Sequence, residues 1–201
     1  MSGRIATLIS GAGSNMLALT DACERGEVPG TPVVVAADRK CEGLSRAQER
    51  GLETVLVEFG AYRERARWDD ALLETIDSYE PDLVVSAGFM RLLAPSFIDA
   101  FGDRLINLHP SLLPAFPGAH AIRDALAHGV KVVGTTVHFV DYDVDHGPII
   151  LQEAVHVEPD DTEEMLHERI KVIERRALPR ACKLFLEGRL SLDDGRVRVR
   201  E

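Results

Sequence analysis

An amide and an imidazole stand two residues apart in an apolar run of the chain. The run is Leu105-Ile106-Asn107-Leu108-His109-Pro110. In an extended strand, residues i and i+2 point to the same side, so Asn107 and His109 should share one face. Proline has no backbone N–H for a sheet, so we expect the strand to end at His109. An amide and a charged imidazole at a strand end could stabilise a developing oxyanion, as acyl transfer requires. An edge strand with a hydrogen-bonded Asn and His is the alternative.

An acidic turn further along the chain could support such an imidazolium. It contains Asp141, Asp143 and Asp145. A carboxylate close to His109 would favour the charged form of its ring. The one-three-five spacing also opens a calcium-binding loop, but glycine falls at the seventh position, glutamate at the thirteenth, and strands are expected on both sides. The seven histidines show no zinc-binding spacing. We therefore expect no metal site.

A glycine-containing loop lies between the first expected strand, residues 4–10, and the first expected helix, residues 16–25. It reads Gly11-Ala12-Gly13-Ser14-Asn15. A strand, a glycine loop and a helix in this order direct free backbone N–H groups at an anion, and serine or asparagine can cap the helix or reach a phosphate. Met16 stands where a dinucleotide-binding loop has its third glycine. Asp38 could still bind a ribose, so a nicotinamide dinucleotide stays open, as does a simple β-to-α turn.

These polar groups need a scaffold, and the apolar pattern predicts alternating strands and helices. Further strands are expected at residues 31–37, 53–57, 82–87, 105–109, 131–140 and 149–157. Further helices are expected at residues 43–50, 62–79, 94–101, 121–127 and 162–186. Thr162 should cap the last helix, and Pro179 should kink or interrupt it. Residues 189–201 either add a peripheral hairpin or stay loose.

The alternation predicts an α/β fold with a doubly wound, mostly parallel sheet of the Rossmann-like type and antiparallel additions in the C-terminal half. One domain over residues 1–201 is expected at this length. Ligands bind at the carboxyl ends of the strands in such sheets. That edge would collect residues 11–15, 88–93 and 107–109, and the convergence of three loops favours a functional site there.

The composition narrows the class of protein. The 201 residues include 23 Lys and Arg against 33 Asp and Glu, a net charge of −10, which argues against a general nucleic-acid or anionic-membrane binder. The three cysteines form no paired pattern, as expected of a reduced, cytoplasmic protein. No apolar run approaches the ~20 residues of a spanning helix, and the N-terminus does not resemble a signal peptide. The oligomeric state stays open, a homodimer included.

Four segments together resemble the formyltransferase family. They are residues 9–15 (ISGAGSN), 87–91 (AGFMR), 107–114 (NLHPSLLP) and 145–149 (DHGPI). The last two are shared across the family, whereas the first matches the branch whose substrate carries a ribose phosphate, the phosphoribosylglycinamide formyltransferases. The resemblance implies two small-molecule partners. A formyl group would pass from 10-formyltetrahydrofolate, the co-substrate, to the amine of glycinamide ribonucleotide, a step of purine biosynthesis.

The resemblance also implies binding roles for residues of this chain. The phosphate of the ribonucleotide would lie on Gly11, Gly13, Ser14 and Asn15. Glu174 resembles a family glutamate that contacts the ribonucleotide. The folate would be contacted by Arg65, Met90, Arg91, Leu92, Leu93 and Asn107, in the pterin pocket largely through backbone groups. Residues 1–100 would then form the phosphate-binding half, and residues 101–201 the catalytic and folate half.

The family resemblance places three residues at the reacting atoms. Asn107 and His109 would flank the formyl carbon, and Asp145 would support His109. His146, the neighbour of Asp145, stands where many relatives have glycine and could perturb the local charge. Pro117 and Gly118 make residues 114–120 a candidate mobile loop.

Other functions stay open. A formyltetrahydrofolate hydrolase shares the catalytic strand and gives the formyl group to water, but such relatives carry an N-terminal regulatory domain, and Met1 stands three residues before the first expected strand. A methionyl-tRNA formyltransferase would need a C-terminal RNA-binding domain. From other classes, a nicotinamide oxidoreductase could use Gly11, Gly13 and Asp38. A non-catalytic nucleotide-binding protein is the last alternative.

Overall fold

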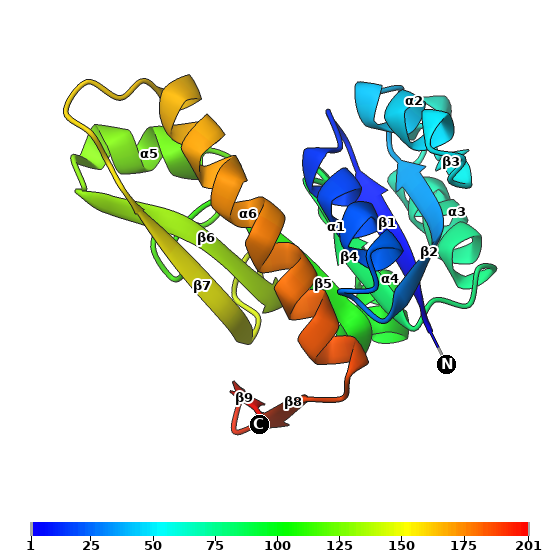
Figure 1. Ribbon diagram of the computed structural model, residues 1–201. Helices are drawn as coiled ribbons and strands as arrows, with labels where there is room; N and C mark the ends of the chain where they lie inside the picture. The colour runs from blue at the N-terminus through cyan, green and yellow to red at the C-terminus, as the bar shows by residue number, and fades with distance from the viewer. Residues whose placement is uncertain (1, 201) are drawn as a thin grey trace.

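The computed structural model describes residues 2–200, and one seven-stranded sheet forms its centre (Figure 1). In their order across the sheet, the strands are β3 (Thr54–Leu56), β2 (Gly30–Ala37), β1 (Gly3–Ile9), β4 (Leu83–Ser86), β5 (Leu105–His109), β6 (Val132–Phe139) and β7 (Ile149–His156). The strands β1 to β5 pair in parallel, β6 is antiparallel to β5, and β7 is antiparallel to β6. This confirms the predicted α/β fold with a mostly parallel sheet and antiparallel additions in the C-terminal half.

Helices cover both faces of the sheet. They are α1 (Ser14–Glu24), α2 (Glu42–Glu49), α3 (Arg65–Asp77), α4 (Pro95–Phe101), α5 (Ala121–His128) and α6 (Glu163–Leu186), with 3-10 turns at η1 (Phe59–Ala61) and η2 (Gly102–Arg104). Residues of α1, α2 and α6 join one apolar core, and residues of α3 and α4 join another. In Figure 1, α1 and α6 run beside each other in front of the sheet.

The alternation of side chains along β1 explains the two cores. Ile5 and Ile9 face the core that includes α1 and α6, whereas Ala6 and Leu8 face the core that includes α3 and α4. All four side chains are fully buried. A strand that is apolar on both faces is typical of a parallel sheet covered by helices on each side.

The strand order reverses at β1, and this fixes the position of a crevice. β2 and β3 lie on one side of β1, and β4 to β7 lie on the other. The loops that leave the neighbouring strands β1 and β4 therefore diverge, as at the ligand-binding edge of other open α/β sheets. The two loops are joined by a hydrogen bond from Ser10 N to Gly88 O of 3.1 Å.

The strand β5 lies inside the sheet, between β4 and β6. The alternative of an edge strand is therefore wrong, because the chain returns after α5 to place β6 along the outer side of β5. The strand ends at His109, directly before Pro110, as the sequence predicts. Asn107 pairs with Ser86 on one side and lies opposite His138 on the other.

The last helix begins as predicted and continues past its proline. The side chain of Thr162 accepts a hydrogen bond from Met165 N, at 3.2 Å, and so caps α6. Of the two effects expected of Pro179, a kink or an interruption of the helix, the interruption is wrong, since α6 is helical throughout. Fully buried neighbours such as Ala177 and Ala181 pack α6 into the core, which offsets the lost backbone hydrogen bond.

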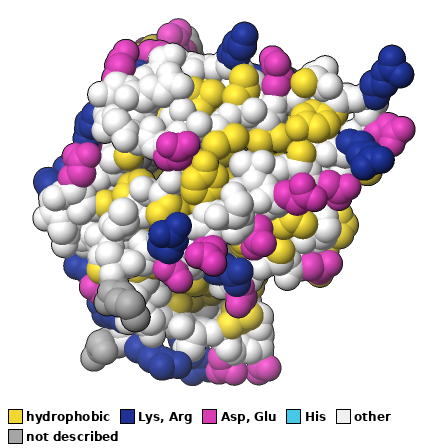
Figure 2. Space-filling model, turned by 90° about the vertical axis from the view of Figure 1, so that its right-hand side faces the viewer, with side chains coloured by type: hydrophobic (Ala, Val, Ile, Leu, Met, Phe, Trp, Pro, Cys, Tyr) yellow, Lys and Arg dark blue, Asp and Glu magenta, His cyan; other side chains and the backbone are white. Residues whose placement is uncertain are grey.

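The chain ends in the hairpin β8 (Leu190–Asp193) and β9 (Arg196–Val199), one of the two alternatives expected for this region. Within residues 2–200, no helix is both long and apolar enough to cross a membrane. Figure 2 shows the side of the molecule that lies on the right in Figure 1. Lys and Arg side chains there stand among Asp and Glu side chains, so this face carries charges of both signs.

Candidate active site

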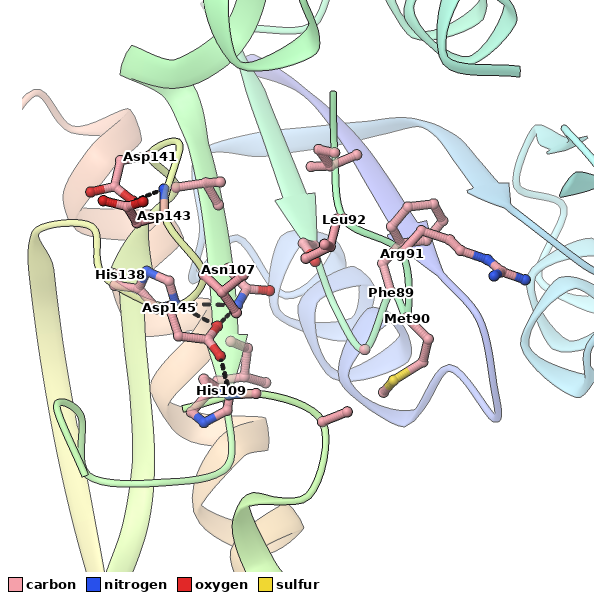
Figure 3. A pocket seen from close by; sticks show the side chains of 18 of the residues that line it. Phe89, Met90, Arg91, Leu92, Asn107, His109, His138, Asp141, Asp143 and Asp145 are labelled. Atoms are coloured by element: carbon pink, nitrogen blue, oxygen red, sulfur yellow. Dashed lines mark hydrogen bonds and ion pairs between the residues drawn. The ribbon is translucent and has the colours of Figure 1, made fainter. Parts of the chain in front are cut away.

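A pocket of about 430 Å³ opens at the carboxyl ends of β4 and β5. Three segments form most of its wall, and these are residues 88–93 after β4, residues 107–110 at the end of β5, and residues 140–145 in the turn between β6 and β7. Figure 3 shows these segments around one hollow. The pocket thus brings together most of the predicted site residues, namely Met90, Arg91, Leu92, Leu93, Asn107, His109 and Asp145.

The carboxylate of Asp145 lies at the centre of the polar part of this pocket. Its Oδ1 is 3.4 Å from Asn107 Nδ2, and its Oδ2 is 3.3 Å from His109 Nδ1. His138 Nε2 is 3.7 Å from Oδ1. The side chain is 11% exposed, so its negative charge acts in a largely dry setting. Figure 3 shows Asp145 between Asn107, His109 and His138.

The imidazole of His138 is held in one orientation beside Asn107. His138 Nδ1 lies 2.7 Å from the carbonyl oxygen of Phe139, and Nε2 lies 3.2 Å from Asn107 Nδ2. Burial lowers the pKa of His138, outweighing the carbonyl of Phe139 and the charge of Asp145. A neutral ring with its proton on Nδ1 donates to Phe139 and accepts from the amide of Asn107.

Both ring nitrogens of His109 face oxygen atoms. Nδ1 faces Asp145, and Nε2 lies 2.9 Å from the carbonyl oxygen of Phe116. The same loop reaches Asp145, because Gly118 N donates to Asp145 Oδ2 at 2.7 Å. Residues 114–120, the candidate mobile loop, therefore contact both members of the His109–Asp145 pair.

The glycine loop lies next to this pocket and does not form its wall. Gly13 has φ 72°, and a Cβ there would lie 2.9 Å from Gly43 Cα, so glycine is required. Gly13 is also the cap of α1 and no side chain caps it, so the predicted capping by Ser14 or Asn15 is wrong. The first N–H groups of α1 remain directed at the loop, where they can bind an anion.

The side chain of Asn15 is engaged elsewhere. Asn15 Nδ2 donates to Glu174 Oε2 at 2.9 Å, which joins α1 to α6 beside the glycine loop. Glu174 is 5% exposed, and burial raises the pKa of its carboxyl although Asn15 opposes the shift. Two predicted ribonucleotide contacts from distant parts of the chain are thus neighbours in space.

The two predicted folate-binding arginines differ in position. Arg91 lines the pocket, but its Nε lies 2.8 Å from Asp38 Oδ2. Arg65 is not on the pocket wall, and it binds Asp69 at 2.7 Å and the carbonyl oxygen of Leu92. The carboxylate of Asp38 is fully buried and paired, which counts against its use as a ribose acceptor in a dinucleotide site.

In the acidic turn, the carboxylate of Asp141 contacts other residues of the same turn. Asp141 accepts from Asp143 N at 3.1 Å and lies 3.1 Å from His146 Nδ1. In the part of the chain that the structure describes, no three His, Cys, Asp or Glu side chains are placed to hold a metal ion.

Several groups at the site were not predicted from the sequence. Ser10 follows β1, and its hydroxyl accepts from Met90 N at 2.8 Å. Phe116 and Gly118 contribute backbone atoms, which carry no signal in the sequence. Tyr142 and Val144 line the pocket beside the predicted Asp145. Their exposure, 67% and 52%, is high for apolar side chains, but the sequence alone does not report it.

Comparisons with known proteins identify chains that are similar in sequence and in fold. The family model described as formyl transferase matches residues 3–182. A Mycobacterium tuberculosis protein named phosphoribosylglycinamide formyltransferase is 49% identical over 175 residues, 87% of this chain and 81% of that protein. An Escherichia coli protein of the same name is 41% identical over 191 residues, 94% and 90% of the two chains. The crystal structure of glycinamide ribonucleotide transformylase 1 from Symbiobacterium toebii superposes with a TM-score of 0.96 and 49% identity, over 99% of this chain and 94% of that one.

Proposed function

The chain belongs to the formyl transferase family, and from this we propose that it transfers a formyl group from 10-formyltetrahydrofolate to the amine of glycinamide ribonucleotide, a step of purine biosynthesis. The observation that carries the proposal is the cluster of Asn107, His109 and Asp145 on the wall of a pocket at the strand ends. An amide donor, an imidazole and a carboxylate in this arrangement suit acyl transfer.

The two substrates would approach the cluster from different sides. The folate would occupy the pocket, with its pterin ring against residues 90–93 and the formyl group at Asn107. The phosphate of the ribonucleotide would lie on the N–H groups at the start of α1, with Gly11, Gly13, Ser14 and Asn15 around it. Glu174 would contact the ribonucleotide beside Asn15. The bond between Asn15 and Glu174 supports this assignment, since it joins the two proposed contacts.

In the reaction that we propose, the amine nitrogen attacks the formyl carbon directly. A new C–N bond forms, and the formyl oxygen becomes an oxyanion that Asn107 Nδ2 stabilises by a hydrogen bond and protonated His109 by its positive charge. Asp145 orients the His109 ring and balances its charge. The intermediate collapses when the bond from carbon to the folate N10 breaks. The amine loses a proton to water, and N10 gains one, so the protons balance.

Neutral His138 would act on the orientation of the Asn107 amide. Because His138 Nε2 can only accept, the atom turned to it must be the amide nitrogen. The second N–H of that nitrogen faces Asp145 Oδ1 across a long 3.4 Å, so it can be shared with an oxyanion that forms beside it. The carbonyl of Phe116 would fix the other side of the catalytic pair through His109 Nε2.

We further propose that one domain over residues 1–201 carries both sites, in the cytoplasm, with small molecules and no nucleic acid or membrane as partners. The single sheet that runs through both halves supports the single domain. A labelling experiment tests the reaction. With ¹³C in the formyl group of the donor, the label should appear on the amine of glycinamide ribonucleotide. Label in free formate would instead indicate the hydrolase.

A further inference from the structure

Asp38 is a buried charge that the proposed reaction does not use. It follows the last residue of β2, and its side chain is 0% exposed. A carboxylate in such a place must be paired, because an unpaired buried charge is strongly destabilising. Its partners are therefore informative about what it holds in place.

One partner of Asp38 is its neighbour Arg39, and the other partners come from the ends of two other strands. Arg91 Nε lies 2.8 Å from Oδ2, and Arg39 NH2 lies 3.0 Å from the same oxygen. Burial alone would raise the pKa of Asp38, but hydrogen bonds from Arg39, Ser10 and Arg91 outweigh it and lower the pKa. The carboxylate is thus charged and joins the ends of β1, β2 and β4.

Two of these partners control the loop after β4. The Ser10 hydroxyl accepts from Met90 N at 2.8 Å, and a hydroxyl that accepts can also donate to a carboxylate. The Arg91 guanidinium lies 4.0 Å above the centre of the Phe59 ring. Phe59 is held by Asp38 as well, because Phe59 N donates to the Asp38 carbonyl oxygen at 2.9 Å.

The position of Arg91 shows what this arrangement does to the pocket. In Figure 3, the Arg91 side chain points away from Asn107 and His109. The loop that bears it has no regular structure and contributes residues 88–93 to the pocket wall, where Met90 is 64% exposed. Its shape therefore depends on contacts outside the pocket. Asp38 joins two of them, through Ser10 and Arg91, and Arg65 holds the carbonyl oxygen of Leu92 separately.

We propose that Asp38 is a positioning residue for folate binding, which acts through Ser10 and Arg91 to hold residues 88–92 as one wall of the pocket. The proposal rests on the proposed function, since it takes a reduced folate as the ligand. Loss of the charge frees Arg91 and loosens the loop. Asn107, His109 and Asp145 are untouched, so the saturated enzyme keeps its turnover while its affinity for the folate falls.

The Asp38→Asn variant tests this, because it keeps the shape of the side chain and removes the charge. The probe is tetrahydrofolate, titrated calorimetrically into the complete chain. We expect the Kd to rise about tenfold, equivalent to about 1.4 kcal/mol, with kcat within about twofold of wild type. Glu27→Gln is the matched control, since Glu27 is an exposed partner of Arg25. A Kd equal to that of the control would overturn the proposal.

Three further measurements keep the test decisive. Hydrogen exchange of the Met90 amide should be faster in Asp38→Asn even without ligand. This measurement tests whether Asp38 holds the loop, independently of whether the ligand is a folate. If wild type neither binds tetrahydrofolate nor transfers formyl groups, the proposed function fails. If Asp38→Asn does not fold, the same titration with tetrahydrofolate is made on Ser10→Ala. A Kd equal to that of wild type in Ser10→Ala would then overturn the proposal. In a double-mutant cycle with Arg91→Gln, the two losses should be less than additive, and full additivity would contradict action through Arg91.

Discussion

Asn107 and His138 lie opposite each other on the antiparallel strands β5 and β6, and their side chains approach to 3.2 Å between Nδ2 and Nε2. The partner of His138 Nδ1 is the carbonyl oxygen of Phe139, so Nδ1 is the donor and Nε2 the acceptor. The amide of Asn107 is therefore orientated by a neutral imidazole, and its NH2 group points toward Asp145 and the pocket. A strand pairing thus fixes the direction of a proposed catalytic donor.

His138 should remain neutral in the folded protein at neutral pH. Burial lowers its pKa below the ordinary 6.5, so the unfolded chain binds a proton first as the pH falls. The stability that the protein gains by keeping His138 neutral is complete above pH 6.5. It is lost as the pH falls toward the lower pKa of the folded state. NMR titration should show a His138 pKa below 6.5. By chemical denaturation, His138→Asn should lose less stability than wild type over the same pH range. An equal loss in the two proteins would contradict the neutral state of His138.

Removal of either residue proposed to stabilise the oxyanion should abolish most of the turnover. Asn107→Ala and His109→Ala should each lower kcat by roughly 10²–10³-fold, the usual cost of one such group. Both should fold, as circular dichroism can check. His156→Ala is a matched control, since the side chain of His156 is exposed on β7 away from the pocket lining. Near-wild-type turnover in either variant would remove that residue from the mechanism.

The buried carboxyl of Glu174 should destabilise the folded protein when it ionises. Burial raises the pKa of its carboxyl above the ordinary 4.5, so stability is complete below about pH 4.5 and falls as the pH rises through the raised value. Glu174→Gln keeps an acceptor for Asn15 and does not ionise. It should therefore be more stable than wild type at pH 7, with a smaller difference at pH 4, by denaturant titration.

The same Glu174→Gln variant should bind its substrate less well. We expect a higher KM for glycinamide ribonucleotide and an unchanged KM for the folate, because the side chain lies beside the glycine loop. Lower stability at pH 7, or a change confined to the folate KM, would show that Glu174 has been misplaced.

His146 should report on the turn that carries Asp145. Its ring is exposed, and Asp141 raises its pKa above 6.5 through a hydrogen bond and through charge. The ion pair is therefore complete below pH 6.5 and is lost as the pH rises through the raised pKa. Asp141→Asn should return the NMR titration of His146 to an ordinary midpoint, while Asp99→Asn, on α4, should not. An unshifted midpoint in wild type would show that the pair does not form in solution.

The parts of the site that follow from local pattern could be predicted. The two-residue spacing of Asn107 and His109, with Pro110 behind them, places both polar groups at a strand end, and the alternation of elements predicts the sheet that receives them. The glycine loop follows from its place between a strand and a helix. The family resemblance, carried by four short segments, was confirmed by the family model over residues 3–182.

The rest depends on tertiary structure. His138 meets Asn107 through the register of β5 against β6, which no spacing in the sequence specifies. Asp38 suggests a ribose contact when only the sequence is known, and the fold instead buries it against Arg91, 53 residues further along the chain. Pro179 is tolerated within α6 because buried residues before and after it in the sequence hold the helix against the core. Helix propensity does not include this packing.

The most direct measurement is the loss of the formyl group from 10-formyltetrahydrofolate, followed by absorbance with and without glycinamide ribonucleotide. We predict that the formyl group is lost only when the ribonucleotide is present. Loss at the same rate without the ribonucleotide would contradict transfer and indicate a hydrolase, and no loss under either condition would contradict the proposed substrates.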